Sequence, residues 1–263
     1  MLIDVDSLDL LLERNVSGIV VLDARPAEDF LAGRVLGARN VDVSSQRPII
    51  RSERDLTGFN EILLEIFRTA GVDRNSKVIV YDDGSGTAAA RGAWMLHYLG
   101  HLDVQVLDGG FAEWGKCNKV VEDGPDRNIY AMGNINILSS RDCMANADDI
   151  VAGEHIVLDV RSNEEFNGVN MRGNPRGGHI PGAIRMGHEV LVDDAGKYRS
   201  PDDIKSTLIE HGIGHSSSVV VYCQSGARSS HTYIGLHIAG VRRIRNYIGS
   251  WYEWSRRDDL PLG

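Results

Sequence analysis

An internal duplication is the feature of this sequence that most restricts its fold. Four patterns from the first half return in the second half, in the same order and at similar offsets. A duplication of this kind predicts two homologous units that fold in the same way. The matching pairs are 22–25 with 158–161, 33–38 with 178–183, 78–82 with 219–223, and 109–114 with 249–254.

Each copy alternates short apolar runs with segments of helical periodicity, which is typical of parallel strands joined by crossover helices. We therefore expect an α/β fold with two tandem units, each a mostly parallel sheet flanked by helices. Residues 59–70 carry apolar side chains at helical spacing and should pack on the first sheet. The expected buried strands are 19–22, 78–81 and 104–107 in the first copy, and 156–160, 219–222 and 243–247 in the second.

A polar stretch between the copies contains Gly124-Pro125-Asp126 and predicts a linker. We place this linker at 119–136, between a first domain over 1–118 and a second over 137–263.

Charge and hydropathy exclude several classes of function. The 263 residues include 37 acidic and 28 basic side chains, for a net charge of -9. This excess repels nucleic acid and anionic membranes, so we expect neither as a partner. No apolar run approaches the roughly 20 residues that span a membrane, and the first residues lack the basic and apolar regions of a signal peptide. The sequence predicts a soluble, cytoplasmic protein.

One of the three cysteines lies in a setting that favours chemistry. Three scattered cysteines do not make a disulfide framework. Cys223, however, follows an expected strand, and residues 223–229 lead into a helical segment. Loop amides and the positive end of a helix stabilise a thiolate, which lowers the thiol pKa and makes the sulfur nucleophilic. Cys117 and Cys143 lack this setting, and we expect them to be unreactive.

With these motifs, the whole chain resembles a tandem-domain rhodanese, the sulfurtransferase family of thiosulfate sulfurtransferase and 3-mercaptopyruvate sulfurtransferase. In that family only the second domain carries the active cysteine, and Asp82 stands here at the position that corresponds to Cys223. The resemblance therefore implies an inactive rhodanese-like domain over 1–118 and a catalytic one over 137–263. The motifs that carry it are 158–161, 178–183, 223–228 and 249–254.

The resemblance also implies a double displacement. Cys223 would take the outer sulfur of a small anionic donor, and a thiol or cyanide acceptor would then remove it from the persulfide. A sulfur-acceptor protein is a further partner of this kind. No cofactor and no metal are required. The amides of residues 224–228 would stabilise the anionic sulfur as an oxyanion hole does.

The expected substrate-binding residues are the loop and nearby arginines. Arg228 closes the loop and is the best candidate to bind the donor's anionic end. Arg172 and Arg176 precede His179, where the family often places substrate-binding arginines. Arg47 and Arg51, in the long loop of the first copy, are weaker candidates. The loop residues in this set are Gln224, Ser225, Gly226, Ala227 and Arg228.

The loop residues point to two different sulfur donors, thiosulfate and 3-mercaptopyruvate. Gln224 is neutral where thiosulfate enzymes typically carry a basic residue, Ser225 resembles the mercaptopyruvate type, and Asn167 replaces an arginine usual in mercaptopyruvate enzymes. Because Arg228 supplies a cation, and residues 44–58 contain no histidine to partner Ser225, we favour thiosulfate. The alternatives are 3-mercaptopyruvate and a non-catalytic persulfide carrier or regulatory binding module.

Other patterns suggest rival chemistries that we do not favour. Residues 84–89 match a dinucleotide-binding pattern, but Asp82 and Asp83 would repel a pyrophosphate. We interpret this longer loop as a relic that cannot form the same amide cradle. The spacing from Cys223 to Arg228 is one residue short of the thiol phosphatase signature C-x5-R.

Two further groups have simple structural explanations. The histidine pairs 97/101 and 211/215 lack a third ligand, so no metal is predicted. Asp159, Arg161 and Glu164 recur in the first copy as Asp23, Arg25 and Glu28, and a group shared with an inactive copy is expected to be structural.

Overall fold

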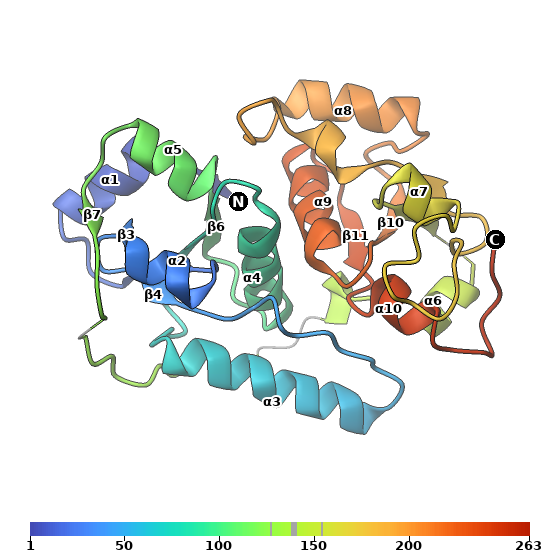
Figure 1. Cartoon of the computed structure of the whole chain (residues 1–263), viewed down its shortest axis with the longest axis horizontal. Coiled ribbons are helices and arrows are strands. Elements are labelled where there is room, and N and C mark those ends of the chain that lie inside the picture. Colours follow the sequence, from blue (N-terminus) through green and yellow to red (C-terminus); the bar gives the residue numbers. More distant parts are fainter. Residues whose placement is uncertain (127, 138–140, 154) are drawn as a thin grey trace. The chain divides into compact units, whose positions relative to one another are not determined.

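The computed structural model describes residues 1–126, 128–137, 141–153 and 155–263. The chain forms two compact units (Figure 1). Unit 1 contains residues 1–46, the described residues of 57–140, and 194–197; unit 2 contains 47–56, the described residues of 141–193, and 198–263. Each unit therefore includes a short segment from the other half of the sequence.

Unit 1 is built on a parallel sheet in the order β1-β6-β5-β2-β4. Its central strand β5 is buried from Val78 to Tyr81, as expected for a parallel sheet covered on both faces. The elements are β1 (Leu2–Ile3), α1 (Val5–Glu13), β2 (Ile19–Asp23), α2 (Ala27–Ala32), β3 (Arg34–Val35), β4 (Arg39–Asn40), α3 (Glu53–Thr69), β5 (Lys77–Tyr81), α4 (Thr87–Tyr98), β6 (Val104–Leu107), α5 (Gly110–Lys116) and β7 (Val121–Glu122). The first four residues of α3 belong to unit 2.

Unit 2 repeats this plan with a parallel sheet in the order β11-β10-β8-β9. The aromatic side chains Tyr222, Tyr247, Trp251 and Trp254 lie in its core. The elements are η1 (Arg141–Cys143), α6 (Ala147–Val151), β8 (Ile156–Asp159), α7 (Asn163–Phe166), β9 (Ile184–Arg185), η2 (His188–Leu191), α8 (Pro201–Glu210), β10 (Ser218–Tyr222), α9 (Ala227–Ile238), β11 (Arg243–Asn246) and α10 (Ser250–Trp254).

The predicted fold class is confirmed, because both units are α/β with parallel sheets and flanking helices. All six expected strands are present within a residue of their predicted limits. The stretch 119–136 contains β7, which pairs antiparallel with β3 of unit 1. The domain boundaries themselves stay a prediction. Over the described ranges, no helix is long and apolar enough to cross a membrane.

Both copies place the same aspartate–arginine pair at a strand end. Arg25 Nη2 lies 2.6 Å from Asp23 Oδ2 and donates to the Gly33 carbonyl. Arg161 Nη2 lies 2.6 Å from Asp159 Oδ2 and donates to the Gly178 carbonyl. The repeated geometry supports a structural role, in which the arginine fastens the loop that follows to the strand.

Candidate active site

Cys223 lies directly after β10, at the start of the four-residue connection that precedes α9. Gly226 is the last residue of this connection and has φ +99°, a backbone conformation that residues with a Cβ rarely adopt. A Cβ at Gly226 would also collide with the side chain of Ile248. The chain therefore passes from strand to helix through a short, tight connection, and the thiol lies next to the first turn of the helix.

Hydrogen-bond donors surround the sulfur of Cys223. The Gly226 amide donates to Sγ at 3.1 Å. Burial raises the pKa of Cys223, but the charge of Arg228, the hydroxyl and amide of Ser229 and the amide of Ser225 outweigh it and lower the pKa below the ordinary value. This setting stabilises the thiolate of Cys223, a residue that is only 1% exposed.

Residues of helix α10 form hydrogen bonds with the backbone of the Cys223 loop. The Trp251 amide donates to the Cys223 carbonyl, and the Tyr252 amide donates to the Gln224 carbonyl. The Ser250 hydroxyl accepts the Cys223 amide at 3.1 Å and lies 4.0 Å from Sγ. Ser250 has φ +53°, an unfavourable backbone conformation for serine. These bonds fix the position of Cys223.

A cavity of about 280 Å³ opens onto Cys223 and is rich in arginine. Three positive side chains and one thiol line it, and this charge favours an anionic ligand. Its lining residues are Arg47, Arg172, Cys223, Gln224, Ser225, Ala227 and Arg228, all in unit 2.

Arg228 is engaged by a carboxylate that the sequence analysis does not identify. Its Nη1 and Nη2 donate to Glu165 Oε2 and Oε1 at 2.6 and 2.8 Å. Burial raises the pKa of Glu165, but Arg228 outweighs it and lowers the pKa below its ordinary range. The charge of Arg228 is thus partly offset before any donor binds.

The other predicted arginines differ in their placement. Arg172 lines the cavity, is about half exposed and lies 3.8 Å from Glu165. Arg176 does not line it; its guanidinium donates to the carbonyls of Trp254, Ser255, Arg257 and Leu260. These contacts favour a structural role for Arg176, in which it fastens the C-terminal segment.

The corresponding loop of unit 1 holds a carboxylate instead of a thiol. Asp82 Oδ1 accepts the amides of Gly84 and Gly86, each at 3.0 Å. Asp82 Oδ2 accepts the amides of Ala88 and Ala89 at 3.0 and 3.1 Å. This longer loop therefore does form an amide cradle around a carboxylate, and the expectation that it cannot form the same cradle around a thiol stays a prediction. Its amides already bind an acidic side chain, so they are not free for a pyrophosphate.

The remaining cysteines lie in different settings. Burial raises the pKa of Cys143 to about 12, so it stays a neutral thiol at physiological pH. Cys117 is exposed near the end of α5.

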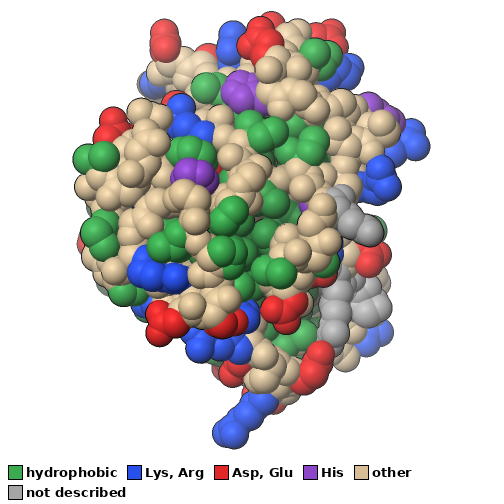
Figure 2. All heavy atoms as spheres, turned by 90° about the vertical axis from the view of Figure 1, so that its right-hand side faces the viewer, with side chains coloured by type: hydrophobic (Ala, Val, Ile, Leu, Met, Phe, Trp, Pro, Cys, Tyr) green, Lys and Arg blue, Asp and Glu red, His purple; other side chains and the backbone are tan. Residues whose placement is uncertain are grey.

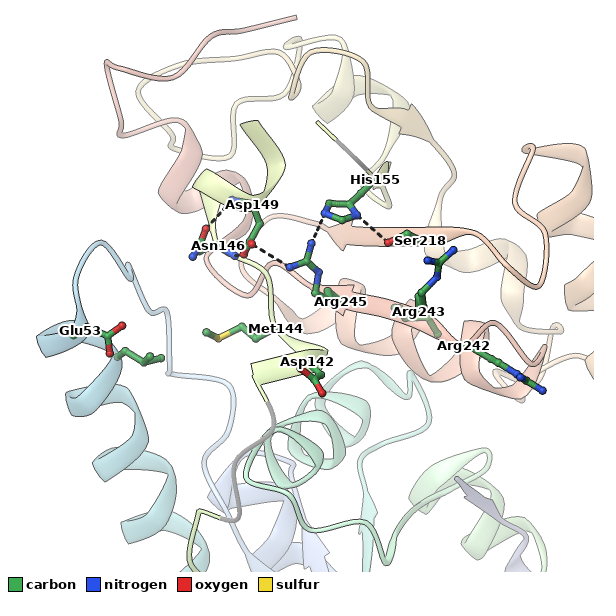
Figure 3. Close-up of a pocket in the computed structure, with 12 residues that line it drawn as sticks. Glu53, Asp142, Met144, Asn146, Asp149, His155, Ser218, Arg242, Arg243 and Arg245 are labelled. Carbon is green, nitrogen blue, oxygen red and sulfur yellow. Dashed lines mark hydrogen bonds and ion pairs between the residues drawn. The ribbon is translucent and has the colours of Figure 1, made fainter. Parts of the chain in front are cut away.

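A larger cavity of about 700 Å³ in unit 2 lies beside the edge strand β11 (Figure 3). Arg245 lies 3.1 Å from Asp149 and contacts His155, whose Nδ1 lies 2.8 Å from Ser218 Oγ. Asp149, Arg245, His155 and Ser218 are joined to one another, and no thiol is among the described lining residues, so the smaller cavity at Cys223 is the better candidate for a reaction site.

The view in Figure 2 shows hydrophobic side chains near the middle of one face and charged side chains toward its edges. Separately, two apolar side chains just before Arg172 are accessible to solvent, since Val169 is 79% and Met171 39% exposed. Apolar side chains therefore lie close in sequence to an arginine of the Cys223 cavity.

Two residues of this site, Glu165 and Ser250, are missing from the sequence analysis, although the sequence contains a signal for each. Glu165 follows Ser162 at the spacing of a capping box, and the structure contains this capping box. Ser250 replaces Gly110 in the fourth repeated pattern. A polar residue that replaces a left-handed glycine beside a candidate nucleophile indicates a role at the site.

Comparison with known proteins agrees with the duplication. A model of the Rhodanese-like domain matches residues 4–117 and 144–257. Thiosulfate sulfurtransferase of Corynebacterium glutamicum is 31% identical over 246 residues, which cover 88% of this chain and 79% of the relative. 3-Mercaptopyruvate sulfurtransferase of Escherichia coli (strain K12) is 27% identical over 246 residues, which cover 91% of this chain and 86% of the relative.

Solved structures share the fold. The anaerobic ergothioneine biosynthesis enzyme from Chlorobium limicola superimposes with a TM-score of 0.84 at 21% identity, covering 99% of this chain and 69% of that enzyme. At this identity the likeness extends to the fold alone.

Proposed function

The chain belongs to the family of rhodanese-like domain proteins, with sulfurtransferases among its relatives, and on that premise we propose that it transfers the sulfane sulfur of thiosulfate to a thiophilic acceptor through a persulfide on Cys223. The observation that carries the proposal is the buried Cys223, whose sulfur accepts loop hydrogen bonds and which lines a cavity together with three arginines.

In the first half-reaction, the Cys223 thiolate attacks the outer sulfur of thiosulfate. A bond forms between Sγ and that sulfur, the original sulfur–sulfur bond breaks, and sulfite leaves with the electron pair. The new terminal sulfur carries a negative charge, which the arginines of the cavity stabilise. The loop amides have the same effect on the thiolate before the reaction.

In the second half-reaction, cyanide or a thiolate attacks the terminal sulfur. The bond to Sγ breaks, and its electron pair returns to Cys223 as the thiolate. The same donors that lower the thiol pKa therefore also make Cys223 a good leaving group. No proton or electron from another source is needed when the acceptor arrives as an anion.

Thiosulfate is favoured because the cavity carries more positive than negative charge. Arg47 and Arg172 add to Arg228, and Glu165 offsets about one of these three charges. A dianion gains more from this excess than the monoanion 3-mercaptopyruvate. Two observations favour 3-mercaptopyruvate as the alternative donor: Ser225 lines the cavity, and the E. coli relative is a 3-mercaptopyruvate sulfurtransferase. A persulfide carrier without turnover is the alternative from another class.

The decisive test is Cys223→Ser. We expect this variant to lose all sulfur transfer from thiosulfate to cyanide while its circular dichroism spectrum stays that of the wild type, because a hydroxyl is not ionised by such donors. Cys117→Ser and Cys143→Ser serve as matched controls and should retain activity. Substantial residual turnover in Cys223→Ser would exclude the persulfide mechanism. A wild-type chain that gains one sulfur atom, seen by intact mass, but never turns over would indicate the carrier.

A further inference from the structure

The segment 47–56 comes from the first half of the sequence but belongs to unit 2. The Ile50 amide donates to Glu253 Oε2 at 3.2 Å, and Arg51 Nη2 donates to the Arg256 carbonyl at 3.3 Å. Glu253 is 1% exposed and lies on α10, the helix whose Ser250 holds the Cys223 amide. The segment is therefore attached to the same helix that supports the nucleophile.

Arg47, the first residue of this segment, lines the Cys223 cavity. Its guanidinium carbon lies 6.0 Å from the ring centre of Tyr252. Arg228 and Arg172 both face the Glu165 carboxylate, whereas Arg47 makes no ion pair with any carboxylate in the part of the chain that the structure describes. Arg47 thus contributes a positive charge that no acid of the described cavity offsets.

We infer that Arg47 is a specificity-determining residue that selects sulfur donors by their negative charge and favours a dianion over a monoanion. This inference deepens the proposed function and rests on it. The Coulomb energy between Arg47 and a bound donor scales with the donor's charge, so removal of Arg47 costs a dianion more than a monoanion. Because Arg47 is exposed, solvent and salt screen the effect, which keeps it modest.

The charge of the cavity can be measured without sulfur transfer. Iodoacetate, an anion, and iodoacetamide, its neutral analogue, both alkylate a reactive thiol, and the ratio of their rates at Cys223 reports the local positive charge. We expect Arg47→Gln to lower this ratio about two- to fivefold at low salt, with a smaller difference at high salt. Arg54→Gln is the matched control: it removes the same charge from the same segment but does not line the cavity, so its ratio should equal that of the wild type.

A kinetic measurement adds a second readout. Arg47→Gln should raise KM for thiosulfate more than KM for 3-mercaptopyruvate, with kcat nearly unchanged, because a ground-state contact is lost. Equal ratios in Arg47→Gln and the wild type, or an equal fall in Arg54→Gln, would overturn the inference. If the wild type transfers sulfur from neither donor, the proposed function fails, while the alkylation ratio still decides whether Arg47 provides the selective charge.

Glu253 should act as a positioning residue for Arg47. Glu253→Gln keeps an oxygen that can accept the Ile50 amide, so we expect an alkylation ratio near that of the wild type. Glu253→Ala removes the acceptor and should lower the ratio as Arg47→Gln does, although Arg47 is still present. A folded Glu253→Ala variant with a normal ratio would contradict this positioning role. If that variant does not fold, Glu253→Gln and Arg47→Gln still test the inference.

Discussion

Arg228 and Glu165 form a bidentate ion pair beside the candidate nucleophile. The side chain of Glu165 is 3% exposed and that of Arg228 is 19% exposed. Arg228 stabilises negative charge on Cys223, and Glu165 holds Arg228 in place. This arrangement gives Arg228 an effect on the thiol itself, in addition to any contact with the donor.

We expect Arg228→Ala to raise the Cys223 pKa. The thiolate population grows as pH rises through this pKa, so the pH profile of alkylation by iodoacetamide should shift to higher pH. The variant should also lose roughly 3 kcal/mol of unfolding free energy, because a buried carboxylate loses its partner. Glu165→Gln is the informative control: it removes the opposing negative charge, so its profile should shift to lower pH. Shifts in the same direction for both variants would contradict this electrostatic account.

The predictable part of the site is the part that local sequence determines. A cysteine between a buried strand and a helix indicates a loop rich in amide donors, and the structure has that loop. The contact between Glu165 and Arg228 joins residues far apart in sequence, and their separation in space depends on the packing of α7 and α9. No periodicity in the chain encodes such a distance.

Helix α9 contains an unusual buried histidine. His231 is 1% exposed, stacks on Tyr198 with ring centres 4.5 Å apart, and has no hydrogen-bond partner for either ring nitrogen within the described residues. Burial, together with the charge of nearby His188, lowers the pKa of His231 to about 3. The folded state therefore holds this imidazole neutral over a range in which the unfolded chain protonates it.

This difference predicts a pH-dependent stability. Below about pH 6.5 the unfolded state binds a proton at His231 that the folded state does not bind until about pH 3. The unfolding free energy should therefore decrease as the pH is lowered across this window. This residue contributes up to about 1.4 kcal/mol per pH unit. His231→Phe should flatten that slope in urea titrations between pH 4 and 7. An unchanged slope would show that His231 does not control the acid limb.

Among the elements, the long apolar ones were predictable and the short ones were not. Helix α3 begins at Glu53, earlier than the apolar periodicity of 59–70 suggests, because Ser52 and Asp55 cap its first turn. Strands β3, β4, β7 and β9 have two residues each. Their pairing depends on where neighbouring chain segments lie, so a sequence pattern of this length cannot specify them.

The two copies differ in the residues of the loop that follows the central strand. Helices α4 and α9 both follow a left-handed glycine, Gly86 or Gly226. The second residue of each helix is Ala88 in unit 1 and Arg228 in unit 2. The amide cradle is therefore common to both units, whereas the cation beside it is not.

This comparison predicts the behaviour of a thiol placed in the first loop. In the double variant Asp82→Cys, Cys223→Ser, we expect no stable persulfide after thiosulfate treatment, because no arginine lowers the pKa of the introduced thiol. Intact mass gives the persulfide content per chain. Adding Ala88→Arg tests the missing cation directly and should increase that content. A persulfide on residue 82 without Ala88→Arg would show that the amides alone are sufficient.

Each unit contains a short segment from the other half of the sequence, 47–56 in unit 2 and 194–197 in unit 1, so neither half of the gene encodes a whole unit. Glu253 of unit 2 binds the amide of Ile50, and its repeat counterpart Glu113 in unit 1 binds Lys197 at 2.6 Å. Each half of the coding sequence therefore encodes a piece of the other half's product. Loss of the first copy would remove no nucleophile, yet it would remove Arg47 and leave a buried glutamate without its partner. The first copy therefore contributes to the structure around Cys223 even though its own loop holds Asp82 in place of a cysteine.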